Sequence, residues 1–342
     1  MRTIEIGKTG MLVPQNAFGA LPIQRIPLEE AKTLLQNAYK GGMRFFDTAR
    51  AYTDSEEKVG AAFKGIRENL YLATKTKAKT PAQFWEDLET SLSKLQTDYI
   101  DLYQFHMVDQ CYKPEDGTGM YECMLEAKAQ GKIRHIGITT HKIQVAHEIV
   151  ESGLYETLQY PFSYLSKQEE IELVQKCKEY EVGFIVMKGL AGGILSNAKA
   201  IFAYLYQFDH VLPIWGIQRQ EELEEWLSFM DQEPALNEEL KEVIAQDRKQ
   251  YEKDFCRGCG YCMPCPVGID IPTSARASIL MRKMNPAIWG SKERQEVMKK
   301  TEDCVNCRTC VSRCPYELNI PELLKKNYAD YLDYYKDVIG GE

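Results

Sequence analysis

The sequence has no long apolar run, no secretion-type N-terminus and no excess of positive charge. None of its 342 residues belongs to an apolar run that could span a bilayer, and the opening Met1-Arg2-Thr3-Ile4-Glu5 does not have the form of a signal peptide. Fifty acidic residues against 42 basic ones give a net charge of −8, which argues against nucleic acid or an anionic membrane as a partner. We therefore expect a soluble, cytoplasmic protein.

Cysteine is scarce in the first 250 residues and abundant after them. Only Cys111, Cys123 and Cys177 precede residue 250, whereas the other eight cysteines lie between Cys256 and Cys314. Such a density suggests disulfides in a small secreted domain, but metal binding in a large cytosolic chain. The sequence therefore predicts a catalytic or binding body followed by a separate metal-binding region.

A glycine-rich nucleotide-binding turn is also missing. Strand and helix patterns alternate over residues 17–230 in eight units, and no G-x-G-x-x-G follows the first strand. An open doubly wound sheet, the alternative, usually carries that turn. The eight strand–helix units and the missing turn therefore favour an α/β fold with a closed (β/α)₈ TIM barrel. We expect the barrel in residues 1–235, and a helical linker, a ferredoxin-like domain and a C-terminal helix (322–337) in residues 236–342. The expected barrel strands are 17–20, 43–47, 69–74, 100–105, 133–138, 156–160, 184–187 and 211–215.

Four polar residues stand at the ends of neighbouring predicted strands. Asp47 ends one strand, and Tyr52 follows it at the expected start of the next helix. Lys75 and His106 follow the next two strands. Taken singly, each has an ordinary explanation as a helix cap, a surface residue or a structural histidine. Because the carboxyl ends of parallel barrel strands share one face, we expect the four to converge in a crevice.

These residue types suit the protonation of a carbonyl oxygen while hydride arrives at carbon. A tyrosine with a pKa near its usual value of about 10 is a weak acid, and a neighbouring ammonium lowers that pKa. Lys75 is expected to supply the ammonium, and Asp47 to keep it charged and in place. His106 is expected to orient the carbonyl oxygen and share its developing charge.

At this point the sequence resembles the aldo/keto reductase superfamily, whose members are NAD(P)H-dependent carbonyl reductases built on (β/α)₈ barrels. The resemblance covers residues 1–230 and implies that Tyr52 is the general acid, that Lys75 and Asp47 tune it, and that His106 orients the substrate. The matching pieces are Gly7-Lys8-Thr9-Gly10, Phe46-Asp47-Thr48-Ala49 with Tyr52, Lys75 after Ala73-Thr74, His106, Gly131-Lys132-Ile133-Arg134-His135-Ile136-Gly137, Gln159, Leu190-Ala191-Gly192-Gly193 and Pro213-Ile214-Trp215-Gly216.

The same resemblance implies a site for NADP(H) or NAD(H). The positions that it assigns to the cofactor are Thr139, Gln159, Met187, Leu190, Gly192, Gly216 and Arg219. Thr139-Thr140-His141 stands where the family usually has a Ser-Asn pair, and Met187 replaces the aromatic residue that stacks on nicotinamide. Arg219 favours NADPH over NADH, and the two departures keep a flavin in the barrel mouth as an alternative.

The eight clustered cysteines form two similar blocks. Cys256, Cys259 and Cys262 are followed by Cys265-Pro266, and Cys304, Cys307 and Cys310 are followed by Cys314-Pro315. Two C-x₂-C-x₂-C runs, each with a further Cys-Pro, are typical of ferredoxins with two [4Fe-4S] clusters, in which the fourth ligand comes from the other block. We therefore assign Cys256, Cys259, Cys262 and Cys314 to one cluster and Cys304, Cys307, Cys310 and Cys265 to the other. Structural zinc, the alternative, would need only pairs of C-x₂-C.

The whole chain thus resembles the ferredoxin-bearing branch of the aldo/keto reductases. We expect an oxidoreductase that reduces a small carbonyl compound, or oxidises an alcohol, in the barrel and transfers electrons through its clusters. Hydride carries two electrons and a cluster accepts one, so a flavin, a separate step or a purely structural role for the clusters would resolve the mismatch. A redox partner of the ferredoxin or flavodoxin type is expected. The alternative is an electron-transfer or scaffold protein whose barrel is catalytically silent or binds flavin.

Overall fold

The computed structural model describes residues 1–251, 255–283 and 286–336, which fall into two compact units. Unit 1 comprises Met1–Gly189 and Asn197–Ala245, and unit 2 comprises Leu190–Ser196 and Gln246–Glu342. The boundary expected from the sequence, after residue 235, lies just before helix α9 (Glu238–Gln250), and unit 1 extends into that helix. The last residue of the predicted C-terminal helix, 337, lies outside the described residues.

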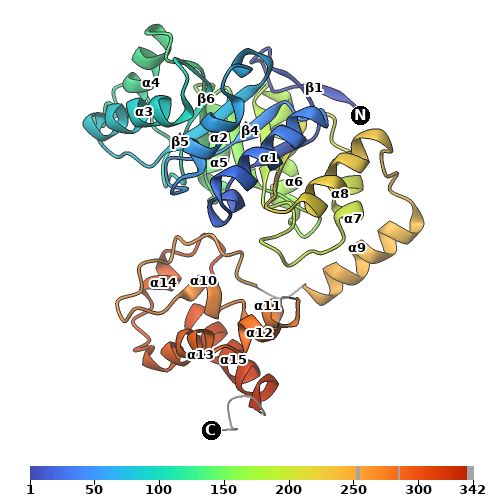
Figure 1. Ribbon diagram of the computed structural model, residues 1–342. Coiled ribbons are helices and arrows are strands. Elements are labelled where there is room, and N and C mark those ends of the chain that lie inside the picture. The colour runs from blue at the N-terminus through green and yellow to red at the C-terminus, as the bar shows by residue number, and fades with distance from the viewer. Residues whose placement is uncertain (252–254, 284–285, 337–342) are drawn as a thin grey trace. The chain divides into compact units, whose positions relative to one another are not determined.

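Unit 1 is built around a closed barrel of eight parallel strands (Figure 1). The strands are β3 (Ala17–Gly19), β4 (Phe45–Asp47), β5 (Tyr71–Thr76), β6 (Ile100–Phe105), β7 (Ile133–Thr139), β8 (Thr157–Pro161), β9 (Gly183–Met187) and β10 (Val211–Gly216). Each pairs with its neighbour in sequence, and β10 pairs with β3 to close the ring. The prediction of a (β/α)₈ barrel is confirmed, and the open sheet is excluded.

A helix follows each strand of the barrel. The helices are α1 (Leu28–Lys40), α2 (Ser55–Phe63), α3 (Pro81–Leu95), α4 (Met120–Ala129), α5 (Ile143–Ser152), α6 (Gln168–Glu179), α7 (Ala198–Leu205) and α8 (Gln220–Asp231). Helix α3 illustrates how the sequence sets their limits. The Thr80 hydroxyl accepts a hydrogen bond from the Gln83 amide, Pro81 occupies the first turn, and Gln96 ends the helix in the left-handed conformation.

A hairpin of β1 (Thr3–Glu5) and β2 (Leu12–Pro14) covers the amino-terminal end of the barrel. Its buried residues Ile4, Met11 and Val13 join the barrel residues Phe45 and Leu102 in one apolar cluster. The backbone N–H of Lys8 donates to the carbonyl of Glu181, just before β9 begins. Because this end is filled with apolar side chains, the opposite, carboxyl end is left for polar chemistry.

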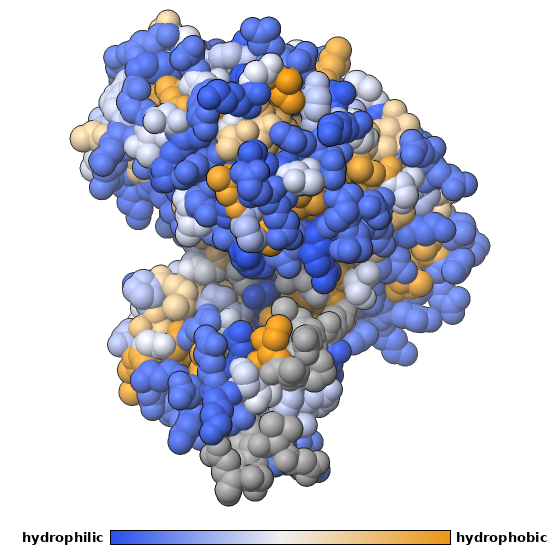
Figure 2. Space-filling view, viewed as in Figure 1, coloured by the Kyte–Doolittle hydropathy of each residue, from blue (hydrophilic) through white to orange (hydrophobic). Residues whose placement is uncertain are grey.

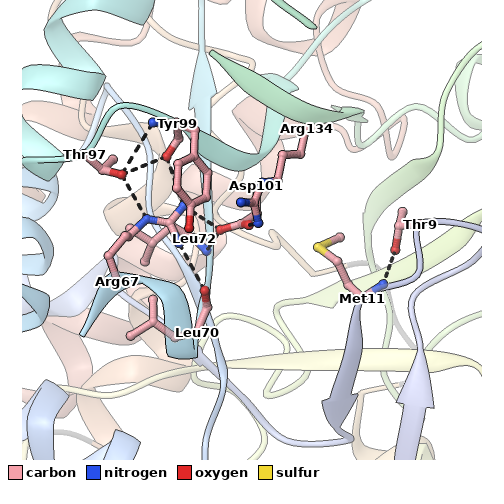
Figure 3. A network of polar contacts seen from close by, with 9 residues as sticks. All are labelled: Thr9, Met11, Arg67, Leu70, Leu72, Thr97, Tyr99, Asp101 and Arg134. Atoms are coloured by element: carbon pink, nitrogen blue, oxygen red, sulfur yellow. Dashed lines mark hydrogen bonds and ion pairs between the residues drawn. The ribbon is translucent and has the colours of Figure 1, made fainter. Parts of the chain in front are cut away.

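A buried carboxylate ties three strands together near the amino-terminal end (Figure 3). Asp101, 1% exposed, accepts hydrogen bonds from Arg67, from Arg134 and from the backbone N–H of Leu72. Both guanidinium groups also lie over the ring of Tyr99, at 4.1 and 3.8 Å. Since every oxygen of Asp101 has a cationic partner, this network has a structural explanation and needs no ligand.

Unit 2 contains two cysteine loops that share left-handed turns at equivalent positions. Its helices are α10 (Ile271–Ser274), α11 (Ala277–Lys283), α12 (Pro286–Trp289), α13 (Lys292–Lys299), α14 (Thr309–Ser312) and α15 (Ile320–Tyr334). Each cysteine block ends in Cys-Pro and leads into an Ile-Pro helix start, at Ile271 and at Ile320. Three pairs of equivalent positions share a left-handed φ: Gly258 (60°) and Asn306 (52°), Gly260 (84°) and Arg308 (59°), Gly268 (79°) and Glu317 (54°).

The viewed face of the molecule is mainly hydrophilic, with hydrophobic residues scattered over it (Figure 2). The most exposed large apolar side chain in the described residues is Val305, at 67%. Within the same residues, no helix combines the length and the apolar character that crossing a membrane requires.

Candidate active site and cysteine loops

The central contact at the carboxyl end of the barrel joins Lys75 to Asp47. The Lys75 ammonium donates to Asp47 Oδ2 at 2.5 Å and to the carbonyl of Thr48 at 2.7 Å. Both side chains are almost fully buried, at 1% and 2% exposure. Asp47 ends β4, as predicted. Lys75 was predicted to follow the next strand, but it lies inside β5. Adjacent parallel strands thus hold the pair in register.

Burial works against both charges of this pair. Burial raises the pKa of Asp47, and the attraction to Lys75 and the hydrogen bonds from Lys75, Gln159 and Gln104 oppose that rise. Burial likewise lowers the pKa of Lys75, against the attraction of Asp47 and of Glu56. The pH range in which both groups are ionised is therefore narrower than for the free side chains.

Tyr52 and His106 complete the cluster of four that the sequence predicts. Their rings meet edge to face with centroids 5.7 Å apart, and the Lys75 ammonium lies 5.3 Å from the centroid of the Tyr52 ring. Tyr52 lies in the turn before α2, not at the start of that helix, and its carbonyl accepts from the N–H of Ser55, where α2 begins. The structure therefore brings Asp47, Tyr52, Lys75 and His106 together.

The expected effect of Lys75 on the acidity of Tyr52 is not found. Burial raises the pKa of Tyr52 well above its usual value of 10.0, and the negative charge of Asp47 raises it further. The ammonium is directed at Asp47 and at the Thr48 carbonyl, so its charge is largely compensated there. At neutral pH the phenol is therefore protonated and can donate a hydrogen bond.

His106 is held in the neutral form. Burial lowers its pKa well below 6.5, and the positive charges of Lys75 and Lys77 and the neighbouring His141 lower it further. Within the described part of the chain, its Nδ1 atom is buried without a hydrogen-bond partner. A neutral imidazole can donate one hydrogen bond to a carbonyl oxygen without adding a charge.

Glu56 belongs to the same network, although the sequence analysis did not identify it. This residue in the first turn of α2 is 1% exposed. Its carboxylate accepts from the hydroxyl groups of Thr74 and Ser91, both at 2.7 Å, and forms an ion pair with Arg50. Arg50 in turn donates its backbone N–H to the carbonyl of Lys75. A glutamate at this position of a helix usually complements the helix dipole, so no sequence signal marks it as buried.

The five predicted cofactor residues in unit 1 have different surroundings. Gln159, on β8, bonds Asp47, and its Oε1 atom is buried without a partner among the described residues. The Thr139 hydroxyl accepts from the N–H of Met107, and Met187 is half-buried at the end of β9. Gly216 is exposed at the end of β10, and the Arg219 guanidinium is paired with Glu222. Of these, the unpaired Gln159 oxygen is a buried acceptor of the kind that a carboxamide N–H₂ would satisfy.

Leu190 and Gly192 belong to unit 2. Their loop is a tight turn in which the Leu190 carbonyl accepts from the N–H groups of Gly193 and Leu195. Ala191, Gly192 and Gly193 all have left-handed φ values, of 49°, 72° and 91°. The Gly192 carbonyl accepts from Nη1 of Arg276 at 3.0 Å, so this turn is fixed to the α10–α11 region of the same unit.

The first thiol set is Cys256, Cys259, Cys262 and Cys314. Cys256 and Cys262 are buried at 6% exposure each, and the N–H of Gly258 donates to the Cys256 sulfur at 3.4 Å. Burial raises the pKa of Cys256, and of Cys262 to about 12, and the proximity of the other thiols of the set adds to both rises. Cys256 and Cys262 thus lie within electrostatic reach of Cys259 and Cys314, as thiols that share one cationic centre must.

The second thiol set is Cys265, Cys304, Cys307 and Cys310. All four line one pocket in unit 2, together with Cys262 and with the apolar side chains of Ile269, Ile271 and Leu324. Among the residues that the structure describes, no three or more His, Cys, Asp or Glu side chains are arranged to hold a single metal ion. A [4Fe-4S] cluster is larger than one ion and takes a thiolate at each corner. The thiolate donors, their number and the apolar lining fit such a cluster.

Comparison with known proteins identifies both units. The model of the Aldo/keto reductase family matches residues 15–244. The chain belongs to this family. The model of the 4Fe-4S dicluster domain matches residues 255–319, so this aldo/keto reductase carries a domain of the type that binds two [4Fe-4S] clusters.

Individual curated relatives are about one third identical to this chain over the aligned residues. The chain is 32% identical to Aldo-keto reductase YhdN of Bacillus subtilis over 189 residues, which cover 51% of this chain and 56% of that protein. It is 33% identical to Methylglyoxal reductase DkgA of Yersinia pestis over 153 residues, 44% of this chain and 53% of that one. The matches therefore span little more than half of these curated relatives.

Two solved structures share the fold. The holo form of aldo-keto reductase AKR11C1 from Bacillus halodurans matches with a TM-score of 0.63 and 23% identity, over 72% of this chain and 96% of that one. An aldo-keto reductase from Klebsiella pneumoniae in complex with NADPH matches with a TM-score of 0.62 and 23% identity, over 74% of this chain and 96% of that one.

Proposed function

We propose that the barrel of this aldo/keto reductase reduces a small carbonyl compound with NADPH, and that its dicluster domain exchanges single electrons with a redox partner protein in a separate step that does not involve the hydride. The observation that carries the first part is the buried ion pair of Lys75 and Asp47 beside Tyr52 and His106. Two buried charges held in this way are costly to keep without a function.

Each residue of the four has a distinct task. Tyr52, protonated at neutral pH, donates its phenolic proton to the carbonyl oxygen. Neutral His106 donates a hydrogen bond to the same oxygen and helps to orient it. Lys75 donates to the Thr48 carbonyl and so helps to position the turn that carries Tyr52, and Asp47 fixes the Lys75 ammonium in place. The alcohol product gains one proton from Tyr52, which regains it from solvent.

NADPH, when bound, supplies the hydride to the carbonyl carbon. Support for a nicotinamide site comes from Gln159, whose unpaired Oε1 would accept from the carboxamide, and from the NADPH complex of the Klebsiella pneumoniae relative. In unit 1, Thr139, Met187, Gly216 and Arg219 are proposed as further contacts. Arg219 donates to Glu222 through Nε and Nη2, and its Nη1 is the group proposed to contact a 2′-phosphate.

In unit 2, the first thiol set is proposed to hold one [4Fe-4S] cluster and the second thiol set the other. Each bound cluster would supply one-electron transfer. The second set includes the exposed Cys307 and lies next to Val305, so its cluster would be the one nearer to solvent and to a redox partner.

Tyr52→Phe tests the catalytic part. This variant keeps the ring and its packing but removes the proton donor, so the NADPH-dependent reduction of a panel of aldehydes and ketones should fall at least a hundredfold. Tyr71→Phe is the matched control, because Tyr71 packs against the apolar cluster at the other end of the barrel. Equal activity of Tyr52→Phe and the wild type would refute the assignment of the acid.

A further inference from the structure

The guanidinium of Arg276 packs against the backbone of the first cysteine loop. It is partly buried and lies between α10 and α11. A Cβ added to Gly258 would lie only 2.6 Å from the Arg276 guanidinium carbon, so the guanidinium packs directly on the Gly258 backbone. Gly258 is the residue whose N–H donates to the sulfur of Cys256.

Two hydrogen bonds fix the guanidinium in this position. Its Nε donates to the carbonyl of Pro272 at 2.7 Å, and its Nη1 donates to the carbonyl of Gly192 at 3.0 Å. Both acceptors are backbone atoms of unit 2. The positive charge is therefore held in place beside the first cysteine loop and does not move freely in solvent.

The equivalent positions of the second cysteine loop carry different residues. Asn306 occupies the position equivalent to Gly258, with the same left-handed backbone but with a side chain where the guanidinium would pack. Lys325 occupies the position equivalent to Arg276, counted from the Cys-Pro of each block, and it is exposed. The two halves of the domain thus share left-handed turns at equivalent positions, and they differ in the partly buried charge of Arg276.

We propose that Arg276 sets the reduction potential of the cluster held by the first thiol set above the value that the same ligands would give alone. This inference rests on the proposed assignment of the clusters. Reduction adds one electron to the cluster and makes it more negative, and a fixed positive charge nearby stabilises that state. The net charge around a cluster and the hydrogen bonds to its sulfurs are the main determinants of its potential. The positive charge of Arg276 also opposes the rise in the pKa of Cys256, which supports its proximity to the sulfur.

The test is an anaerobic redox titration, monitored by electron paramagnetic resonance, of the wild-type protein and four variants with their iron content measured. Cys314→Ser identifies the signal of the first cluster. Arg276→Gln should lower the midpoint potential of that cluster alone. We expect the ratio of its reduced to its oxidised form at a given potential to fall about tenfold, which corresponds to a shift of about 59 mV for one electron. Arg276→Lys, which keeps the charge, should lie between this value and that of the wild type. Lys325→Gln is the matched control and should shift either potential by less.

Several outcomes would overturn the inference. If Arg276→Gln holds both clusters and neither potential moves, or both move equally, Arg276 does not tune the first cluster. If Arg276→Gln binds too little iron to be titrated, Arg276→Met, which keeps the length and apolar packing, replaces it under the same criterion. Wild-type protein without iron would overturn the cluster assignment and this inference together, whereas loaded clusters with unmoved potentials would overturn this inference alone.

Discussion

Arg50 and Glu56 form an ion pair that closes the turn carrying Tyr52. The carboxylate is 1% exposed and the guanidinium side chain 20% exposed, so the pair is only weakly screened by solvent. Arg50 stands two residues before Tyr52 and also bonds the backbone of Lys75. The ion pair therefore connects the acid to the strand that holds the lysine.

Replacing Glu56 with Gln should impair both stability and catalysis. Glutamine can satisfy at most part of the set formed by Arg50, Thr74 and Ser91, and hydrogen bonds to a charged group contribute about 1.5–3 kcal/mol. We expect a loss of about 2 kcal/mol in the free energy of unfolding in urea and a severalfold loss in kcat/KM. Glu57→Gln, at the exposed neighbouring position, should change neither. Wild-type kcat/KM in the Glu56 variant would show that the pair does not position Tyr52.

The pH dependence of activity should show a narrowed plateau. Activity that needs ionised Asp47 is lost as the pH falls, and the raised pKa of Asp47 moves this loss to a higher pH than an ordinary carboxyl would give. Activity that needs charged Lys75 is lost as the pH rises, and its lowered pKa moves that loss to a lower pH. A profile of kcat/KM against pH measures both limbs. If the apparent pKa values of the two limbs equal those of free Asp and Lys side chains, the profile would contradict the buried pair.

His106 should make the protein less stable in mild acid. Above pH 6.5 the histidine is neutral in both the folded and the unfolded chain, so it adds no pH dependence. As the pH falls below 6.5, the unfolded chain binds a proton that the folded site resists, and stability is lost towards the lowered folded pKa. His106→Asn should remove this part of the loss between pH 7.5 and 5.5, as read from urea midpoints. Identical pH slopes in the variant and the wild type would contradict a buried neutral His106.

Much of the fold followed from the sequence, because strand and helix periodicity and the spacing of cysteines are local signals. The eight strands of the barrel were predicted close to their observed positions. The contacts that differ from the sequence-based expectations depend on three-dimensional packing. Lys75 was expected to acidify Tyr52, but its charge faces Asp47, and Glu56 looked like an ordinary helix-start residue. Likewise, nothing in the sequence indicated that the turn at Gly192 bonds Arg276, 84 residues later.

Asp101→Asn should separate stability from catalysis. Asp101 pairs with Arg67 and Arg134 near the amino-terminal end of the barrel. Removing a buried partner from such a network typically costs about 3–5 kcal/mol. We expect a large fall in the urea midpoint, while kcat per folded molecule at a temperature below unfolding stays at the wild-type value. A fall in kcat that matches the Tyr52 variant would place the active site elsewhere.

The crossed assignment of the cysteines predicts which substitutions affect the same cluster. Cys265→Ser should alter the same electron paramagnetic resonance signal as Cys304→Ser, although Cys265 lies in the first block. Cys314→Ser should alter the other signal, together with Cys256→Ser. Cys177→Ala, at a fully buried position in unit 1, should leave the iron content unchanged. Signals that group by block, with Cys265 alongside Cys256, would contradict the crossing.

The most direct test of the proposed function is to follow the hydride itself. NADPH deuterated at both C4 positions would be incubated anaerobically with the protein and a reducible carbonyl compound, with the visible spectrum recorded before the product is analysed by mass spectrometry. We expect deuterium on the carbinol carbon of the product from the wild type and from Tyr71→Phe, and at least a hundredfold slower labelling with Tyr52→Phe. Unlabelled product, or no alcohol while the cluster absorbance bleaches, would show that electrons from NADPH bypass the four residues at the end of the barrel.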